Sequence, residues 1–241
     1  MKKAELQKYR QVVGKLQWLV TARPDIAFRV KTLARETSGV TPDSWRKVKH
    51  LLRYLQGTKN IVFKIQPDVR LQSSEVDLDL HVFSDSDWAG DVATRKSASG
   101  FLVQLCGTTI VFGSRTQATI ATSSCEAELC GLGTATAEAL HIQHLLHEAS
   151  FSKNLPSITV FADSSATKSL SSRIGVGHTS KHIQLRCLYT QALISSKLIK
   201  LQKAHTSLNF ADLFTKQLPD KALTELRDKV GLQGCTVFRM G

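Results

Sequence analysis

Several residue classes are scarce among the 241 residues, and each scarcity excludes a class of protein. The five cysteines contain no C-x-x-C pair, so a zinc site and a disulfide framework are both poorly supported, and reduced thiols are expected. Prolines number only five, no repeat or low-complexity segment occurs, and the 42% of hydrophobic residues suffice for one sizeable core, or one core with a smaller appendage. No run approaches the roughly 18 apolar residues of a membrane helix, and no signal peptide opens the chain. We therefore expect a soluble, intracellular protein that is neither membrane-bound nor secreted.

Acidic residues are scarce in the N-terminal quarter. The formal net charge is +12, and residues 1–65 contain 15 Lys and Arg against 4 Asp and Glu, whereas the remaining residues contain 17 against 16. The basic character therefore belongs almost entirely to the first quarter. Such a surface attracts polyanions, most often nucleic acid, because binding releases counterions. A solvated helical surface without a partner is the alternative.

The basic quarter has the apolar periodicity of helices. Apolar residues recur at steps of three and four in 4–20, 23–37 and 42–58, with Lys and Arg on the other faces. Pro24 lies near the start of the second helix, and Gly57 ends the third. The pattern predicts a small helical unit with a basic exterior.

From residue 78 the apolar pattern becomes that of strands. Runs at 78–85, 100–107 and 108–114 are strand-like, and Gly107 favours antiparallel pairing of the last two. A long helix follows, which Ser123 or Ser124 can cap. The further segments are a strand at 157–164, helices at 165–172 and 179–196, a strand at 197–206, and helices at 207–218 and 220–232. This order predicts an α/β fold with a mixed sheet covered by helices.

Acidic residues recur at the predicted ends of these elements. Asp85 and Asp163 follow strands, Glu126 and Glu128 open the long helix, and Asp212 lies early in a late helix. Strand ends and helix starts gather along a common edge of an α/β sheet, so these carboxylates can converge. Converging carboxylates repel one another unless a cation lies among them, and Mg²⁺ prefers such oxygen ligands. Each acid alone also has a simpler explanation as a turn or helix-start residue.

Several blocks of the sequence resemble the ribonuclease H region at the C-terminal end of a copia-type LTR retrotransposon polyprotein. The matching blocks are FSDSDWAGD, RKSASGFLV, TSSCEAEL, VFADSSA, TSKHIQLR and NFADLFTKQLP. Upstream, YRQVVGKLQWLVTARPDIAF and LLRYLQGTKN resemble the segment that connects the reverse transcriptase to the ribonuclease H. The resemblance covers nearly the whole chain, with the blocks in the family's order. It implies the ribonuclease H-like fold, a five-stranded mixed sheet flanked by helices.

The resemblance also implies an activity. The family cuts the RNA strand of an RNA–DNA hybrid with carboxylates that hold two Mg²⁺ ions, which Mn²⁺ can replace. By motif position the ligands and catalytic residues are Asp85, Glu128, Asp163 and Asp212. His205, just before the last ligand, is an accessory candidate for proton transfer or product release, and an exposed loop histidine is the alternative reading.

Other residues are assigned less directly. Gln184 stands where the family usually has an acid and Leu188 where histidine is frequent, which affects positioning near Arg186. Turn geometry explains Asp87 and Asp91. The candidates for contact with the nucleic-acid backbone are Arg95, Lys96, Ser97, Lys181, His182 and Lys216.

The expected division of the chain has four parts. They are a basic helical segment at 1–65 that resembles the C-terminal tail of a reverse transcriptase, a linker at 66–77, a ribonuclease H-like domain at 78–218, and a C-terminal helix and tail at 219–241. No Y-x-D-D motif of a polymerase palm occurs, so no DNA synthesis is expected. The expected partners are an RNA–DNA hybrid and the rest of a reverse transcriptase, in the cytoplasm, an element's particle or the nucleus.

Two other functions are compatible with the sequence. One is a catalytically idle or domesticated module that binds nucleic acid or a protein. The other is an integrase-type or resolvase-type nuclease on the same fold, against which the acid in NFADLFTK argues. The oligomeric state is left open.

Overall fold

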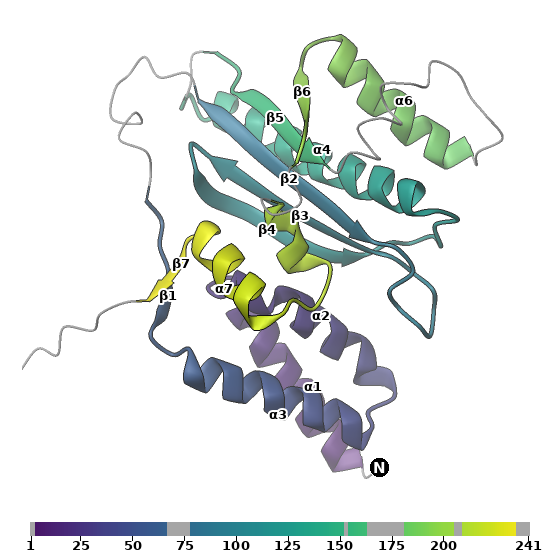
Figure 1. Cartoon of the computed structure of the whole chain (residues 1–241), viewed down its shortest axis with the longest axis vertical. Helices are drawn as coiled ribbons and strands as arrows, with labels where there is room; N and C mark the ends of the chain where they lie inside the picture. Colours follow the sequence, from purple (N-terminus) through teal and green to yellow (C-terminus); the bar gives the residue numbers. More distant parts are fainter. Residues whose placement is uncertain (1–2, 67–77, 152–153, 163–180, 205–208, 235–241) are drawn as a thin grey trace, which may run out of the picture. The chain divides into compact units, whose positions relative to one another are not determined.

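The protein is described by a computed structural model over residues 3–66, 78–151, 154–162, 181–204 and 209–234, with the backbone alone for 181–187. The chain forms two compact units (Figure 1). One contains Met1–Lys64 together with Gln217–Gly241, and the other contains Ile65–Lys216. The grouping of the last residues with the first was not predicted from the sequence. The four functional parts proposed above remain predictions.

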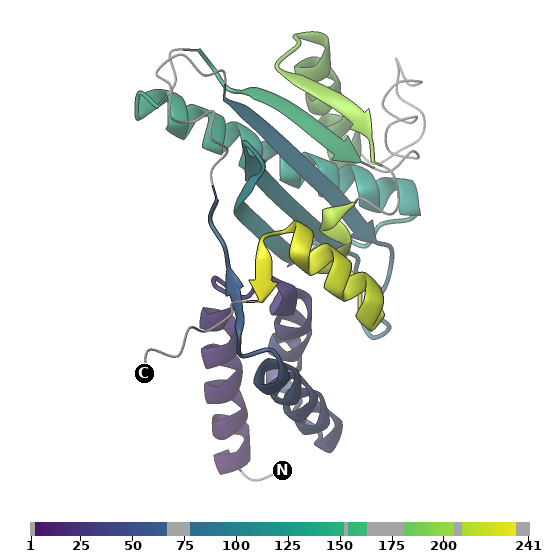
Figure 2. The same cartoon turned by 60° about the vertical axis from the view of Figure 1, so that its left-hand side comes forward.

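The N-terminal helices form the first unit's core (Figure 2). They are α1 (Lys3–Leu19), α2 (Ala27–Arg35) and α3 (Pro42–Gly57), with short 3-10 helices η1 (Pro24–Ile26) and η2 (Glu36–Ser38). All three predicted helices are confirmed. Their apolar stripes pack together, with Tyr9, Val30 and Val48 buried. Thr41 caps α3 through a reciprocal capping box with Ser44, which fixes where that helix begins.

A two-stranded sheet completes this unit. Strand β1 (Ile61–Phe63) pairs antiparallel with β7 (Leu232–Gly234), which follows helix α7 (Asp220–Lys229). The predicted helix at 220–232 therefore ends at Lys229, and Leu232, its last predicted residue, begins a strand. Strands of three residues carry almost no period-2 signal, so the sequence does not show them.

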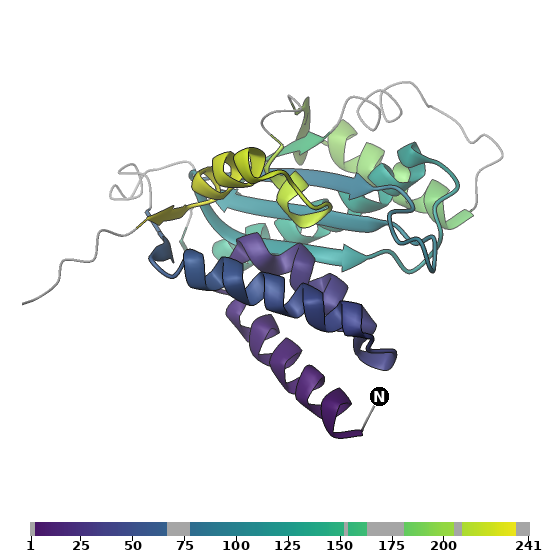
Figure 3. The same ribbon diagram turned by 60° about the horizontal axis from the view of Figure 1, so that its bottom comes forward.

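The second unit is built on a five-stranded mixed sheet of order β4-β3-β2-β5-β6 (Figure 3). Its strands β2, β3 and β4 form an antiparallel meander, and β5 and β6 run parallel to β2. Gly107, with φ of +80°, lies in the turn between β3 and β4, as predicted. The bounds are β2 (Asp79–Asp87), β3 (Ala98–Leu105), β4 (Thr108–Thr116), β5 (Ser157–Ala162) and β6 (Ile199–Lys203). The predicted fold class, a five-stranded mixed sheet flanked by helices, is confirmed.

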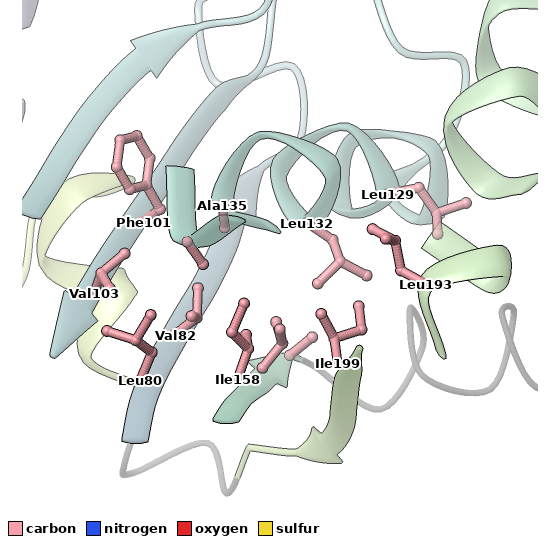
Figure 4. Packing of buried hydrophobic residues seen from close by; sticks show 13 residues of the cluster. Leu80, Val82, Phe101, Val103, Leu129, Leu132, Ala135, Ile158, Leu193 and Ile199 are labelled. Atoms are coloured by element: carbon pink, nitrogen blue, oxygen red, sulfur yellow. The ribbon is translucent and has the colours of Figure 1, made fainter. Parts of the chain in front are cut away.

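The sheet's main core lies against the long helix α4 (Ser124–Glu148), with α6 (Lys181–Ser195) packed beside it. Figure 4 shows Leu80 and Val82 of β2 among side chains from α4, α6 and the strands β3, β5 and β6. Alternate residues of β2 point to the opposite face. There Phe83 contacts Phe210, with ring centroids 4.3 Å apart, in a short 3-10 helix, η5 (Phe210–Phe214).

Of two further predicted helices, one is shorter than expected and the other lies outside the described residues. Of the helix predicted at 207–218, the described residues 209–218 contain only the five-residue η5, and Pro219 disfavours a helical conformation in Leu218 just before it. The helix predicted at 165–172 lies outside the described residues. In the described ranges, none of the helices has the length and apolar character needed to cross a membrane.

Candidate active site at the end of strand β2

Asp85 lies within β2, two residues before the strand ends at Asp87, rather than just past the strand as predicted. Its Cα partner across the antiparallel ladder is Gly100 on β3. The side chain is 15% exposed, and its Oδ2 accepts a hydrogen bond from the hydroxyl of Thr215. Asp85 therefore points to the face of the sheet that carries η5, and a residue 130 positions later in sequence holds its carboxylate.

Asp212 lies in η5 and faces Asp85. Burial raises the pKa of Asp212, and the negative charge of Asp85 raises it further, whereas a hydrogen bond and the charge of Lys216 act in the opposite direction. The pKa of Asp212 is raised to about 6. Burial alone lowers the pKa of Lys216, but its hydrogen bond to Asp212 and the charges of Asp85, Asp212 and Asp87 outweigh burial and raise it. The two carboxylates thus form one electrostatic group with a neighbouring ammonium.

A buried amide positions η5 against β2. Asn209 is 5% exposed and caps η5, because its Oδ1 accepts from the backbone N–H of Ala211 at 3.3 Å. Its Nδ2 donates to the carbonyl oxygen of Ser84, the residue before Asp85, at 3.1 Å. One side chain therefore sets both the start of η5 and its distance from the strand that carries Asp85.

The close approach of η5 to the sheet also requires a glycine. A Cβ atom on Gly100 would lie 2.7 Å from the carbonyl oxygen of Ala211, 2.7 Å from Cγ2 of Thr215 and 2.9 Å from Cβ of Phe214. Real Cβ atoms essentially never approach other heavy atoms below 3.0 Å, and a backbone oxygen cannot turn aside. The RKSASG block therefore ends in a glycine because η5 rests on it, directly opposite Asp85.

Replacing Asn209 with Asp is expected to keep the cap of η5 and to remove the hydrogen bond to Ser84. The carboxylate keeps an acceptor for Ala211 but loses the donor to Ser84, whose buried carbonyl would then face a negative oxygen. An unsatisfied buried acceptor costs about 1–3 kcal/mol, so the melting temperature should fall, and alignment of Asp212 with Asp85 should suffer. Thermal unfolding measures the first effect. The exposed Asn60 provides the control, since Asn60→Asp should change stability little; equal melting temperatures for both variants would contradict the assignment.

The start of α4 separates the two glutamates of the CEAEL block. Ser123 caps the helix, as predicted, by accepting from the N–H of Glu126 at 3.2 Å. The Glu126 carboxylate is buried and accepts from the N–H of Thr122 at 2.8 Å and from its hydroxyl. Glu126 is thus a helix-start acid, as the resemblance implied. Its hydrogen bonds explain its burial without a metal.

Glu128 begins the part of α4 that approaches β2. One turn further along, a Cβ on Gly131 would clash with the hydroxyl of Ser86 and lie 3.2 Å from the carbonyl oxygen of Asp85. Residues three apart share a helix face, so Glu128 lies on the side of α4 that faces the strand end. Trp88 ties the two elements together, because its Nε1 donates to the carbonyl oxygen of Ala121, just before the helix, at 3.0 Å.

The loop between β2 and β3 has its own hydrogen bonds. Asp91 accepts from the N–H of Ala93 at 3.3 Å and from the hydroxyl of Thr94, which is the turn role predicted for it. Arg95 is exposed, at a positive φ of 56°. Ser97, in contrast, is 1% exposed, and its hydroxyl accepts from the N–H of Ala89. Because this hydroxyl is buried and already used, we leave Ser97 out of any nucleic-acid interface.

Four of the predicted site residues cannot be placed. Asp163 and His205 lie outside the described residues, and the side chains of Lys181 and His182 are not described. The same holds for Gln184 and Arg186, whereas Leu188 is half exposed. The last described residue before Asp163 is Ala162, at the end of β5, and the neighbouring Phe161 pairs with Phe83 on β2.

The structure brings two predicted ligands together, and sequence reasoning missed their support. In the part of the chain that is described, no group of three or more His, Cys, Asp or Glu side chains is close enough to hold a metal ion. The donor set of Asp85 and Asp212 nevertheless fits Mg²⁺, which takes hard oxygen ligands and keeps several waters. Asn209, Gly100 and Thr215 were not predicted as site residues, and only the cap potential of Asn209 was visible in the sequence.

Curated proteins that are similar to this chain include polyproteins of transposons. The retrovirus-related Pol polyprotein from transposon RE2 of Arabidopsis thaliana is 30% identical over 227 residues, which cover 93% of this chain and 15% of that protein. The corresponding polyprotein from transposon TNT 1-94 of Nicotiana tabacum is 29% identical over 225 residues, which cover 93% and 16%. Nearly the whole chain is therefore similar to one region of the retrovirus-related Pol polyproteins of transposons. It spans about one sixth of the length of these Pol relatives, and no protein-family model matches it.

A shorter curated protein and two solved structures are also similar to parts of this chain. The secreted RxLR effector protein 161 of Plasmopara viticola is 38% identical over 133 residues, which cover 55% of this chain and 89% of that protein. The N-terminal RNase H domain of rv2228c from Mycobacterium tuberculosis is 16% identical, with a TM-score of 0.42, and covers 63% of this chain and 97% of that one. RNase H1 from Halobacterium salinarum is 14% identical, with a TM-score of 0.41, and covers 61% and 98%.

Proposed function

We propose that the chain is a Mg²⁺-dependent endonuclease that hydrolyses the RNA strand of RNA–DNA hybrids as part of retrotransposon replication, in a copia-type element. The observation that carries this proposal is the built pairing of Asp85 with Asp212. Two partly buried carboxylates face each other, and Asn209, Thr215 and Gly100 hold the elements that carry them. Facing carboxylates repel each other, and Lys216 offsets this repulsion only in part, since the pKa of Asp212 is still raised to about 6; the pair therefore suits a divalent cation.

Four acidic residues are the proposed metal ligands. Asp85 and Asp212, joined by Glu128 from α4 and Asp163 after β5, would hold two Mg²⁺ ions, or Mn²⁺ in their place. When bound, these ions supply an activated water and stabilise the leaving oxygen of the phosphodiester. The chain itself contributes the orientation: the Thr215 hydroxyl fixes one oxygen of Asp85, and the Asn209 amide sets the height of Asp212 above the strand. His205 is proposed as an accessory residue for proton transfer or product release.

The N-terminal unit offers a surface for the nucleic-acid backbone. A groove of about 520 Å³ between α2 and α3 has an apolar floor and a strongly basic rim. Its only acidic lining residue, Asp43, is paired with Arg46 at 3.3 Å and Lys47 at 3.1 Å. Lys49 and Arg53 are exposed on the rim, and the described residues include no carboxylate in ion-pair contact with either. These side chains suit phosphate contacts that carry no base information.

Removing the charges of Lys49 and Arg53 together is expected to weaken hybrid binding and to reduce its salt dependence. Each lost phosphate contact should lower the slope of log affinity against log salt by about 0.9. Fluorescence anisotropy with a labelled hybrid, at several KCl concentrations in EDTA, measures both. Lys8→Gln with Lys15→Gln on exposed positions of α1 is the matched control of equal charge change. If both double variants bind alike, the groove is not the binding surface.

In the second unit, a few residues are proposed to contact the nucleic-acid backbone. Arg95 and Lys96 in the loop after β2, and Lys181 and His182 at the start of α6, remain candidates for backbone contact. Selectivity for RNA would come from 2′-hydroxyls and the shape of the hybrid groove, since base edges are not needed. The proposed partners are therefore an RNA–DNA hybrid and the remainder of a reverse transcriptase.

Cleavage of an end-labelled RNA–DNA hybrid tests the proposal. The full chain should cut the RNA strand with Mg²⁺ and not in EDTA, and should leave single-stranded RNA and duplex DNA intact. Asp163→Asn should abolish cutting, which also tests a residue that the structure does not place. Equal cutting by wild type and Asp163→Asn would overturn the assignment of the site.

A catalytically idle or domesticated module is the second candidate. It is favoured by the match to the secreted RxLR effector protein 161, of which this chain covers 89%, because that relative is itself a short protein. This reading predicts salt-dependent binding of the hybrid without Mg²⁺-dependent turnover. The same hybrid assay therefore separates the two functions.

A further inference from the structure

Lys216 holds its ammonium beside the two facing carboxylates. Its Nζ lies 2.8 Å from Oδ2 of Asp212 and 3.9 Å from Oδ2 of Asp85. The Lys216 side chain is 47% exposed, whereas those of Asp85 and Asp212 are each 15% exposed. The positive charge therefore reaches the carboxylates from the solvent side of the site, which is the side from which an ion or a substrate must also enter.

The backbone before Lys216 is fixed in a way that directs this side chain. Thr215 is fully buried, and its hydroxyl donates to Asp85. The N–H groups of Thr215 and Lys216 both donate to the carbonyl oxygen of Asp212, at 3.3 and 3.4 Å. Asp212 and Lys216 are thus four residues apart in a closed turn, so the ion pair is built into the end of η5.

We propose that Lys216 is the resident counter-cation of Asp85 and Asp212 in the metal-free protein, and that a divalent ion must displace its ammonium to bind there. This inference rests on the proposed metal-dependent function. Two facing carboxylates repel each other, and a cation within about 4 Å of both offsets that repulsion. An ammonium and a divalent ion cannot both lie close to the same oxygens at low cost, so they compete.

The competition gives Lys216 a different role from the phosphate contact predicted for it. In the metal-free protein its ammonium is already engaged by carboxylates. Once displaced, the half-exposed side chain becomes available to a phosphate of the nucleic acid. Lys216 would then stabilise the empty site and add to substrate binding only after the metal has entered.

The test compares Lys216→Met and Lys216→Arg with the control Lys200→Met, an exposed residue of β6 in the same unit. Mn²⁺ affinity, measured by calorimetry on the full chain, should increase about two- to fivefold in Lys216→Met, the range expected for an ion pair of this exposure. Lys216→Arg and Lys200→Met should resemble wild type. Thermal unfolding should show a loss for Lys216→Met in EDTA that shrinks with saturating Mg²⁺.

Unchanged Mn²⁺ affinity in Lys216→Met, or an equal loss of melting temperature in EDTA and Mg²⁺, would overturn the competition. A wild-type chain that binds no Mn²⁺ at millimolar concentration would instead overturn the proposed metal-dependent function. In that case the ion pair between Lys216 and Asp212 is tested separately, in EDTA. If it holds the site, Lys216→Met should lower the melting temperature in the wild-type background and not in Asp212→Asn; equal losses in both would refute the counter-cation role.

Discussion

Asp85→Asn is expected to reduce Mg²⁺-dependent cleavage of an RNA–DNA hybrid by about a hundredfold to a thousandfold or more. Asparagine keeps the shape of the side chain and an oxygen for the Thr215 hydroxyl, so the fold should be retained. What is lost is the negative charge, and with it a ligand for an ion that contributes several kcal/mol of transition-state stabilisation. Single-turnover cleavage of a labelled hybrid, with circular dichroism to confirm folding, measures the effect.

Asp91→Asn is the matched control from the same nine-residue block. Asp91 accepts from the Ala93 N–H and the Thr94 hydroxyl in the loop after β2, and an asparagine oxygen can accept one of these bonds. Its cleavage rate should stay within about twofold of wild type, as for surface changes away from special features. An equally severe loss in Asp91→Asn would show that the loop, and not only the strand end, takes part in the reaction.

Two acids selected from the sequence lie together in the structure, whereas the contacts that support them were not predicted. Asp85 and Asp212 could be selected because polar residues at element ends and a family's motif order are both visible in the sequence. Ser123 could be predicted as a cap because capping is a local property of a helix start. The bond from Asn209 to Ser84 joins segments 125 residues apart, and no local pattern encodes such a contact.

The close contacts at two glycines were likewise not visible in the sequence. Gly100 begins a predicted strand and Gly131 lies within a predicted helix, and nothing in the sequence indicates that η5 and β2 pack against them. Within the predicted helix at 42–58, Leu51 is 1% exposed, whereas the adjacent and equally apolar Leu52 is 45% exposed. Periodicity indicates a face to within about one residue, and tertiary contacts decide which neighbour is buried.

The facing carboxylates are also expected to make the metal-free protein less stable at neutral pH than Asp212→Asn. Asp212 has a pKa of about 6 in the folded protein, against an ordinary value of 3.8. Between these values the folded protein holds a proton that the unfolded chain has released, so this carboxyl stabilises the fold below about pH 4 and that contribution is lost as the pH rises through 6. Asparagine does not titrate, and it relieves the repulsion from Asp85 at every pH.

In EDTA the advantage of Asp212→Asn in the free energy of unfolding should therefore grow between pH 4 and pH 7.5, by up to about 3 kcal/mol for a shift of roughly two pKa units. Urea unfolding of both proteins at several pH values measures it, and Asp91→Asn, which lies in an exposed loop, should track wild type throughout. Mg²⁺ should narrow the difference at pH 7.5, since an ion that binds only the folded wild type stabilises it by mass action. A difference that stayed constant from pH 4 to 7.5 would mean that burial and the charge of Asp85 do not raise the pKa of Asp212. Loss of cleavage together with a gain in stability would instead mark Asp212 as a residue retained for chemistry at the expense of the fold.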